Sequence, residues 1–345
     1  MFDTKYFPGA LKFWQMGELH DWDEVTVHAM SHVMHYGSSV FEGIRAYDTE
    51  RGPAIFRLKE HIDRFFHSAS ILNMEVPYNE AEIEAAIKLV MRENRLRSAY
   101  IRPNLYYGYG NLGLVPKFSK IELSVGCWGW GAYLGEEGVA KGVHCLLLPW
   151  KRIHKSQTDM GAKLGGLYVL SNRAGTYARR KGYDEGIFLN MEGRVSEGPG
   201  ENIFVVKNER LKTNSESESI LEGITRTTIL KLAKDFGYET EVGPITLEEL
   251  WNADEVFFTG TAAEVTPVTK ITDGRDTTIA KEDCLIHRIG NGKPGKITLN
   301  MKNLYNEVVT GKHKKYDKWL TYVYSCMEEA ERYLNEVSVS DNGRF

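Results

Sequence analysis

The sequence predicts a two-domain protein of the α/β (α+β) class. Its 345 residues exceed the length of one ordinary domain. Strand-like and helix-like patterns occur both before and after a glycine-rich stretch at 126–138, which is typical of a connection between domains. We therefore expect three parts: a small α/β domain at 1–130, a linker at 131–139, and a large domain with a C-terminal helical tail at 140–345.

Composition and charge restrict the classes of function. The hydrophobic content of 42% and the charged content of 26% are ordinary for a globular protein. A net charge of −4 would not attract nucleic acid or an anionic membrane, so we expect neither as a partner. We find no signal peptide, no run of about 18 apolar residues, and no metal-site spacing among the four cysteines. These features favour a cytoplasmic protein with reduced thiols.

A helix is expected at 79–94, and a strand is expected soon after it. Asn79 can cap the helix because Glu82 lies three residues further on, as in a capping box. Four apolar residues share one face at helical spacing: Ile83, Ile87, Val90 and Met91. The segment 98–107 is rich in tyrosine and isoleucine, which is typical of a strand.

Further strands and helices are expected after the linker. Four apolar runs have the length of strands: 143–148, 186–190, 202–206 and 255–259. Helical patterns occur in three segments: 165–181, 225–236 and 315–336. The second of these helices ends at Gly237, a residue that favours a left-handed stop. Polar composition predicts loops at 214–219 and 272–295.

The glycines at 108, 110 and 113 match the GxGxxG pattern of a dinucleotide-binding loop. A nicotinamide site of that type needs a helix that opens directly after the last glycine. Here Leu114 and Val115 are followed by a proline, and the segment lacks helical periodicity. The pattern therefore favours a flexible glycine-rich loop over a nicotinamide-dependent oxidoreductase.

Three histidines at helical spacing allow a metal site as one interpretation. His28, His32 and His35 could share a face of a helix. No acidic residue lies between them, and the sequence there does not match a motif such as HExxH. Local hydrogen bonding is the commoner role of such histidines, so we expect no metal.

Two segments could bind anions through backbone amides. Gly223 opens the helix expected at 225–236, and the N-terminus of a helix favours a phosphate group. Thr261 follows Gly260 after the expected strand 255–259, where the amides of a tight turn can face an anion. Two such segments are consistent with a phosphate and a carboxylate.

Two further residues have competing interpretations. Lys163 lies among Gly161, Gly165 and Gly166, and a lysine that forms a Schiff base needs such room. A surface lysine at a helix start is the simpler interpretation of this pattern. Glu197 lies in a Gly/Pro turn, for which a hairpin loop with solvated acids is the alternative. The residues taken alone therefore do not name a reaction.

The arrangement of these segments resembles the fold-type-IV family of pyridoxal-phosphate enzymes. The family signature runs from a glutamate through an Asn-aliphatic-aromatic strand to a Gly-aliphatic-x-basic helix start. It matches here at Glu197 and in three segments: 202–204, 211–213 and 221–226. Within the family, the chain is similar to bacterial branched-chain amino-acid aminotransferases, which belong to class IV, from about residue 12 to residue 323. Supporting stretches are 35–37, 40–45, 99–103, 130–135, 163–168 and 260–264.

The resemblance implies that the chain binds pyridoxal 5′-phosphate through an internal aldimine on Lys163. Lys163 would also act as the base that moves a proton of the substrate. Glu197 would keep the pyridine nitrogen protonated, Tyr168 would bond to the ring hydroxyl, and Leu221 would pack on the ring. Four residues would hold the phosphate: Arg64, Ile224, Thr225 and Thr261.

The resemblance also implies transfer of an amino group between leucine, isoleucine or valine and 2-oxoglutarate. The amides of Thr261 and Ala262 would bind the α-carboxylate, and Arg102 would pair with the γ-carboxylate of glutamate. Six residues would line the side-chain pocket: Tyr36, Phe41, Tyr100, Leu114, Trp130 and Tyr133. Tyr36 and the loop at 108–114 would come from the partner subunit of a homodimer or a higher homo-oligomer.

Two other enzymes of the same fold are the nearest alternatives, a D-amino-acid aminotransferase and an aminodeoxychorismate lyase. The Tyr-Ile-Arg-Pro context of Arg102 argues against both. Three features depart from the family pattern. Pro199 stands where the signature has a small residue, and Leu167 replaces a polar residue. A tail of about twenty residues extends beyond Tyr322.

Overall fold

The computed structural model describes residues 6–131 and 134–335. The chain divides into two compact units. Their segments are Met1–Gly131, Ala162–Gly166 and Glu307–Phe345 for the first unit, and Ala132–Gly161 and Leu167–Asn306 for the second. The first change of unit lies beside the expected domain boundary at 130. The expected large domain at 140–345 differs from the second unit, because two of its segments belong to the first.

Backbone pairing explains why these two segments join the first unit. The C-terminal strand β16 (Leu320–Tyr322) pairs antiparallel with β5 (Ala54–Phe56). The short segment that contains Lys163 is joined by an isolated β-bridge between Val40 and Leu164. Both partners lie far away in the sequence, so local periodicity did not indicate the assignment.

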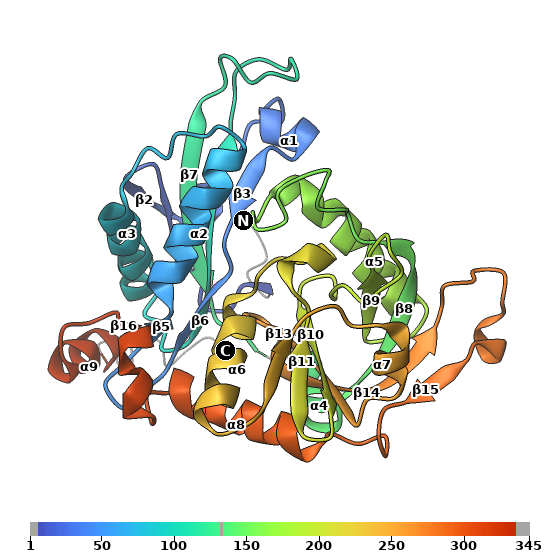
Figure 1. The fold of residues 1–345 in the computed structure, drawn as a ribbon. Helices are drawn as coiled ribbons and strands as arrows, with labels where there is room; N and C mark the ends of the chain where they lie inside the picture. Colours follow the sequence, from blue (N-terminus) through green and yellow to red (C-terminus); the bar gives the residue numbers. More distant parts are fainter. Residues whose placement is uncertain (1–5, 132–133, 336–345) are drawn as a thin grey trace. The chain divides into compact units, whose positions relative to one another are not determined.

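The first unit is built on an antiparallel sheet with the strand order β16-β5-β4-β6-β7-β1-β2, and β3 pairs with β6 (Figure 1). The other strands are β1 (Lys12–Gln15), β2 (Glu18–Asp21), β3 (Ser39–Phe41), β4 (Ile44–Tyr47), β6 (Ala99–Tyr107) and β7 (Ile121–Trp128). The helices that begin before the linker are α1 (His32–Tyr36), α2 (Leu58–Ile71) and α3 (Glu80–Glu93). α3 packs against β1, β6 and β7, and α2 packs against β3 and α3.

The expected helix at 79–94 is confirmed as α3. Asn79 Oδ1 accepts from the backbone N–H of Glu82 at 3.0 Å, and a carboxylate oxygen of Glu82 accepts from the N–H of Asn79 at 2.8 Å. The four apolar residues that were predicted to share a face are at most 1% exposed. The expected strand at 98–107 is confirmed as β6, which forms a hairpin with β7.

The second unit is built on a mixed sheet with the strand order β12-β11-β10-β13-β14-β8-β9, and β15 pairs with β14 (Figure 1). Its strands are β8 (Val143–Lys151), β9 (Glu185–Leu189), β10 (Asn202–Lys207), β11 (Arg210–Thr213), β12 (Thr240–Val242), β13 (Glu255–Gly260), β14 (Glu264–Asp273) and β15 (Ile286–Arg288). The helices that begin in it are α4 (Gly135–Lys141), α5 (Tyr168–Arg180), α6 (Ile224–Asp235), α7 (Leu247–Trp251) and α8 (Lys296–Val309). α5 packs against β8 and β9, whereas α6 packs against β12 and β13.

Most elements expected after the linker are confirmed. The four predicted strands are β8, β9, β10 and β13, and the first two predicted helices are α5 and α6. Gly237 has a φ of +84°, as expected of a left-handed stop. Helices and sheets occur together in each unit, so the expected α/β (α+β) class is confirmed.

Three expectations need correction. The predicted helix at 315–336 is wrong as one element, because the edge strand β5 pairs with β16 and interrupts it. The segment instead forms a 3-10 helix (Lys314–Trp319), β16 and helix α9 (Met327–Asn335). The predicted loop at 272–295 contains β15, which pairs with the end of β14. The predicted linker at 131–139 includes the first turn of α4.

The tail beyond Tyr322 packs on the first unit through α9. Ala330 is fully buried, and a Cβ added to Gly52 would lie 3.1 Å from the Ala330 Cβ. Arg92 Nη2 lies 3.9 Å from Glu329 Oε1. Across residues 6–131 and 134–335, no helix combines the length and the apolar character that a membrane crossing requires.

Candidate active site

The backbone of Lys163 is held on both sides by the first unit. Its N–H donates to Ser68 Oγ at 2.8 Å, and its carbonyl oxygen accepts from the N–H of Phe41 at 3.2 Å. Leu164 forms the bridge to Val40 that was noted above. Lys163 is half-buried, so its position differs from that of a surface lysine at a helix start.

A buried carboxylate lies beside this lysine segment. Glu42 is fully buried and accepts two hydrogen bonds from Arg64, from Nε at 2.6 Å and from Nη2 at 2.9 Å. His61 Nδ1 lies 2.7 Å from the same carboxylate, and burial lowers the pKa of His61, so the neutral ring donates through Nδ1. Burial alone would raise the pKa of Glu42, but the charges of Arg64 and His61 lower it overall.

Glu42 is therefore ionised and fixes the guanidinium of Arg64, which was predicted as a phosphate ligand. The sequence analysis quoted Glu42 within a supporting stretch but gave no role to Glu42 or His61. The signal that was available is the spacing of 61, 64 and 68 on one helix, since residues three or four apart share a face.

Phe41 lies between the lysine and the predicted specificity residue. The ring centroid of Phe41 is 5.0 Å from Lys163 Nζ and 4.6 Å from Arg102 Cζ. Arg102 Nη2 donates to the hydroxyl oxygen of Tyr100 at 3.1 Å. Trp130 extends this aromatic surface, because its ring centroid lies 4.7 Å from that of Tyr100.

Two features show that this place can receive a carboxylate. Arg102 Nε is buried, and it has no hydrogen-bond partner among the residues that the structure describes. A Cβ added to Gly43 would collide with the hydroxyl oxygen of Tyr100, so only glycine at this position lets the tyrosine come this close. The structure thus brings Phe41, Tyr100, Arg102, Trp130 and Lys163 together, as the resemblance implied.

Tyr36 is attached to the loop at 108–114. Its hydroxyl donates to the carbonyl oxygen of Leu112 at 2.8 Å, and its ring packs on His32 with a centroid distance of 4.6 Å. The ring nitrogens of His32 lie 2.7 Å from Ser38 Oγ and 3.0 Å from the carbonyl oxygen of Gly113. His32 therefore bonds locally, and the loop joins β6 to β7 without a helix after Gly113, which contradicts a dinucleotide-binding turn.

The side chains of Tyr36 and Leu114 are exposed, at 44% and 81%. They lie on one edge of the first unit together with further exposed apolar residues: Met34, Tyr109, Val115 and Phe118. The predicted pocket residue Tyr133 lies outside the described residues.

In the second unit, Glu197 is buried and held by three donors. Arg152 Nε donates to Oε1 at 2.8 Å, while Asn202 Nδ2 at 3.2 Å and the N–H of Leu221 at 3.1 Å donate to Oε2. Arg152 also donates through Nη1 to Ser171 Oγ of α5 at 3.2 Å. Glu197 is only 4% exposed, so the alternative of a solvated hairpin acid is wrong. The sequence analysis missed Arg152, which lies 45 residues away.

Asn202 connects Glu197 to both predicted anion-binding segments. Its Nδ2 donates to the carbonyl oxygen of Leu221 at 2.8 Å, two residues before the N-cap of α6. A Cβ added to Gly223 would collide with Asn202 Oδ1, so glycine is required where α6 begins. In the sheet, Asn202 pairs with Thr259, near the end of β13.

The two predicted anion-binding segments therefore lie close together. Ile224 and Thr225 form the first turn of α6 and are 8% and 2% exposed. Thr261 and Ala262 form the tight turn between β13 and β14, which closes with the pair Gly260–Glu264. Helix N-termini and tight turns both present backbone N–H groups, and those of these segments can bind a phosphate and a carboxylate. Tyr168 begins α5 and is half-buried.

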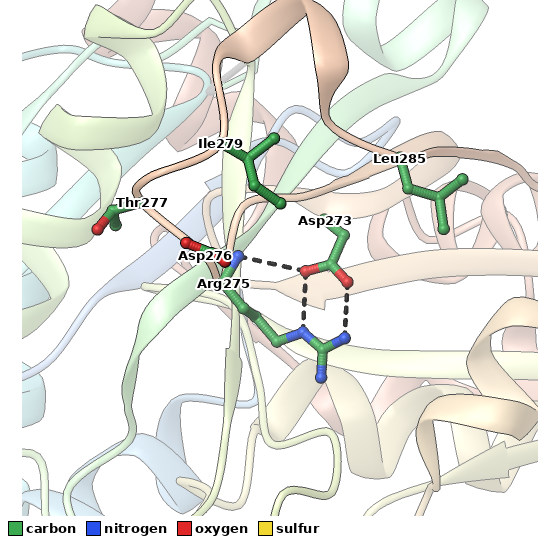
Figure 2. Close-up of a pocket in the computed structure, with 6 residues that line it drawn as sticks. All are labelled: Asp273, Arg275, Asp276, Thr277, Ile279 and Leu285. Carbon is green, nitrogen blue, oxygen red and sulfur yellow. Dashed lines mark hydrogen bonds and ion pairs between the residues drawn. The ribbon is translucent and has the colours of Figure 1, made fainter.

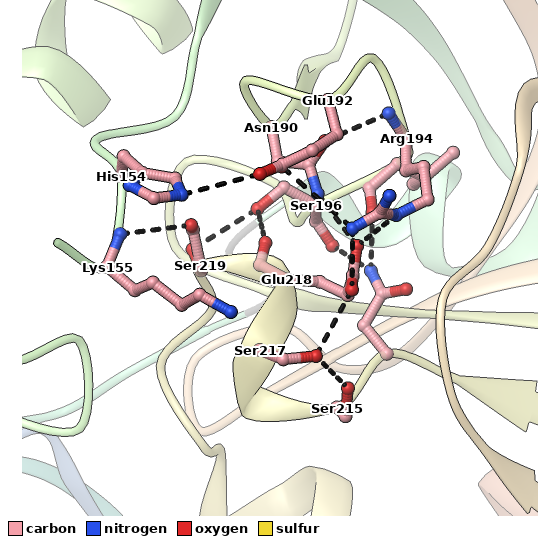
Figure 3. Close-up of polar contacts among 12 residues, drawn as sticks. His154, Lys155, Asn190, Glu192, Arg194, Ser196, Ser215, Ser217, Glu218 and Ser219 are labelled. Atoms are coloured by element: carbon pink, nitrogen blue, oxygen red, sulfur yellow. Dashed lines mark hydrogen bonds and ion pairs between the residues drawn. The ribbon is translucent and has the colours of Figure 1, made fainter.

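A second buried carboxylate supports the backbone next to Glu197 (Figure 3). Glu218 accepts from Arg194 Nε at 2.6 Å and from Asn190 Nδ2 at 2.7 Å. Burial would raise the pKa of Glu218, but bonding to Arg194 lowers it overall. Ser196, which precedes Glu197, donates to the carbonyl oxygen of Glu218 at 2.9 Å. These bonds tie the strand that ends at Glu197 to the loop that leads to Leu221.

A pocket of about 500 Å³ lies elsewhere in the second unit, at the loop between β14 and β15 (Figure 2). Asp273 and Arg275 line it and bond to each other, with Arg275 Nε at 2.8 Å and Nη2 at 2.6 Å from the carboxylate oxygens. None of the residues that line this pocket was predicted as a site residue, and its charged groups already satisfy each other.

Comparison with known proteins gives consistent matches. A family model described as Amino-transferase class IV matches residues 39–271. The branched-chain-amino-acid aminotransferase of Pseudomonas aeruginosa is 43% identical over 310 residues, which cover 90% of this chain and 96% of that protein. The branched-chain amino acid aminotransferase of Escherichia coli has a solved structure with a TM-score of 0.85 and 40% identity, covering 91% of this chain and 100% of that one. A solved branched-chain amino acid aminotransferase with pyridoxamine 5′-phosphate, from the organism abbreviated T.th., has a TM-score of 0.84 and 44% identity, covering 91% and 99%.

Proposed function

Because this chain belongs to the amino-transferase class IV family, we propose that it is a pyridoxal 5′-phosphate-dependent branched-chain amino-acid aminotransferase. Its substrates would be leucine, isoleucine or valine and 2-oxoglutarate. The observation that carries the proposal is the group in which one Phe41 ring lies beside both the Lys163 amine and the Arg102 guanidinium. The family and the fold type IV that the sequence predicted are confirmed.

The residues present fit the cofactor. When bound, pyridoxal 5′-phosphate supplies an electron sink for the carbon that loses its proton. Glu197 is a buried carboxylate with three donors, which suits it to hold a protonated pyridine nitrogen. We assign Tyr168 to the ring hydroxyl and Leu221 to the ring face. We assign the phosphate to Arg64, Ile224, Thr225 and Thr261.

The reactive residues have distinct tasks. Lys163 holds the cofactor covalently, and its Nζ then takes the proton from Cα of the substrate. Amides at Thr261 and Ala262 bind the α-carboxylate. Arg102 pairs with a γ-carboxylate, and Phe41 and Tyr100 cover the guanidinium when the side chain is aliphatic. The proposal requires Lys163 and Glu197 to act on one cofactor.

The alternatives are less well supported. The relatives at about 40% identity carry branched-chain names, which favours this activity over a D-amino-acid aminotransferase or an aminodeoxychorismate lyase. A nicotinamide-dependent oxidoreductase would need a helix after Gly113, where a hairpin loop stands.

Covalent labelling tests the proposal directly. We expect borohydride reduction of the protein with pyridoxal 5′-phosphate to label Lys163, because its backbone is fixed and its amine lies beside Phe41. The measurement is mass spectrometry of the labelled peptide. The matched control is Lys155→Ala, which removes a lysine from the same region and should leave the label unchanged. A label on another lysine would contradict the assignment.

We further propose a homodimer, or a higher homo-oligomer, in which Tyr36 and the loop at 108–114 complete the partner's site. The support is the exposed apolar edge that contains Tyr36 and Leu114, since contiguous apolar surface is typical of an interface. Mixing two variants tests this. Lys163→Ala lacks the lysine, and Leu114→Asp places a charge on the loop.

We expect each variant alone to be weakly active and the mixture to regain activity. In a mixed dimer, one intact Lys163 would receive an intact loop from the partner. If the loop served its own chain, each site would lack one element and the mixture would stay inactive. A sedimentation measurement on both variants controls for loss of the dimer.

We also propose that the protein works in the cytoplasm with reduced thiols. The support is that all four cysteines are free, with Cys127 and Cys145 buried. Fractionation of cells that express the chain tests this, and recovery in a secreted fraction would contradict it.

A further inference from the structure

Ser68 touches two of the residues to which we assign the cofactor. Its side chain is fully buried in α2. Its Oγ accepts from the backbone N–H of Lys163 at 2.8 Å, although the two residues are 95 positions apart. The same Oγ donates to the carbonyl oxygen of Arg64 at 2.8 Å. One hydroxyl group therefore joins the backbones of Lys163 and Arg64.

A serine that bonds back to the carbonyl four residues earlier is common in helices, so the Arg64 bond alone would mean little. Ser70 provides the comparison within the same helix. Its Oγ bonds to the carbonyl oxygen of His67 at 2.7 Å, but its side chain is exposed. Ser68 differs because its buried hydroxyl also receives the Lys163 N–H from a segment distant in the sequence.

The lysine segment has few other side chains that could fix it. Gly161, Ala162, Gly165 and Gly166 surround Lys163 and offer little packing surface. The carbonyl oxygen of Lys163 is held by Phe41, and its N–H is held by Ser68. Replacing Ser68 with alanine would leave that N–H without its acceptor in a buried place, which is unfavourable unless the segment shifts.

Side chains make the same connection a second time. Glu42 follows Phe41 and holds the guanidinium of Arg64, while the N–H of Phe41 holds the Lys163 carbonyl. Lys163 and Arg64 are thus connected through Ser68 on one side and through residues 41 and 42 on the other. This closed arrangement fixes the distance between the residue that forms the covalent bond and the residue that binds the phosphate.

We propose that Ser68 is a positioning residue that sets the spacing between Lys163 and Arg64, so that the amine meets the aldehyde of a cofactor whose phosphate is already bound. This inference rests on the proposed function. Displacements below about 1 Å are enough to slow a reaction between held groups strongly. Ser68 itself touches neither the cofactor nor the substrate in this assignment.

The test compares two cofactor forms on the purified full chain. Pyridoxal 5′-phosphate reacts with the lysine, whereas pyridoxamine 5′-phosphate binds without a covalent bond. For Ser68→Ala we expect the rate of covalent bond formation, followed by absorbance, to fall about 10- to 100-fold. We expect the dissociation constant of pyridoxamine 5′-phosphate, measured by calorimetry, to change less than about threefold, because the phosphate ligands remain.

Three controls make the outcome decisive. Ser70→Ala removes an exposed hydroxyl from the same helix and should change neither quantity. Ser68→Thr keeps the hydroxyl and should restore most of the rate. Melting temperatures separate a folding defect from a positioning defect, since a folding defect would weaken both cofactor forms equally.

Two outcomes would overturn the inference. One is a covalent rate for Ser68→Ala within twofold of native, and the other is an equal loss of affinity for both cofactor forms. Failure of the native chain to form the bond at all would instead contradict the proposed function, which is measured first.

Discussion

Replacing Glu197 with glutamine is expected to lower kcat about 100- to 10,000-fold in the exchange between leucine and 2-oxoglutarate. A neutral amide cannot hold the pyridine nitrogen in its protonated state, so the carbanion formed at the substrate loses its stabilisation. The phosphate ligands are untouched, and cofactor retention should therefore change much less than turnover. Steady-state kinetics and the absorbance of the bound cofactor measure the two quantities.

The surroundings of Glu197 predict how the variant would fail. Its carboxylate accepts from Arg152, Asn202 and Leu221, and the amide nitrogen of glutamine cannot accept from any of them. Arg152 is 4% exposed and would lose its charged partner, so some loss of stability is expected as well. Melting temperature must be recorded alongside turnover.

Two further variants separate charge from folding. Glu197→Asp keeps the charge on a shorter side chain and should retain more activity than the glutamine variant. Glu192→Gln removes an exposed acid from the neighbouring turn and should leave activity unchanged. Turnover of Glu197→Gln within a few-fold of native would show that this carboxylate is only structural.

Periodic segments were predictable from sequence because their signals are local. The helix α3 carries its own capping box and an apolar face, and α6 begins at a glycine and ends before one. Strands β8, β10 and β13 are apolar runs in a buried sheet. The sequence analysis named no strand of the first sheet before β6, since β1 to β5 have only three or four residues each.

The supports of the site could not be read from the sequence. Glu42, His61, Ser68 and Arg152 act through partners between 19 and 95 positions away. The sequence shows which residue types occur, but pairing over such separations depends on the order of strands in the sheet. The resemblance supplied the ligands of the cofactor, whereas the structure supplied the residues that hold those ligands in place.

The C-terminal segment was misread for a related reason. Residues 315–336 contain helical patterns at both ends, and only pairing with β5 shows that Leu320–Tyr322 is a strand. An edge strand this short gives no local signal, because three residues cannot show an alternating pattern over a useful length.

The last expected result separates the two half-reactions. Arg102→Met should lower kcat/KM for glutamate about 30-fold to a few thousand-fold, while leucine should change much less. Leucine carries no charge at the side-chain end, whereas glutamate carries a carboxylate that needs a cation in a desolvated place. The range corresponds to roughly 2–5 kcal/mol, the usual cost of removing one partner of a buried charge pair.

The structure supports this role for Arg102 through its contacts. Its Nε is buried without a hydrogen-bond partner among residues 6–131 and 134–335, so a donor is available for an incoming carboxylate. Phe41 and Tyr100 cover its guanidinium at 4.6 and 5.3 Å, which lets an aliphatic side chain pack on aromatic carbon instead.

A structural role is the competing explanation, because Arg102 lies in β6 and pairs with Gly126 of β7. Single-turnover rates with leucine and with glutamate, measured alongside melting temperature, distinguish the two. Arg97→Met is the matched control, since Arg97 precedes the same strand, is exposed, and contacts Asp48 at 3.4 Å. Equal losses for both substrates, together with a lower melting temperature, would mean that Arg102 braces the sheet. A selective loss for glutamate would mean that one pocket accepts two kinds of side chain by changing what lies on the guanidinium.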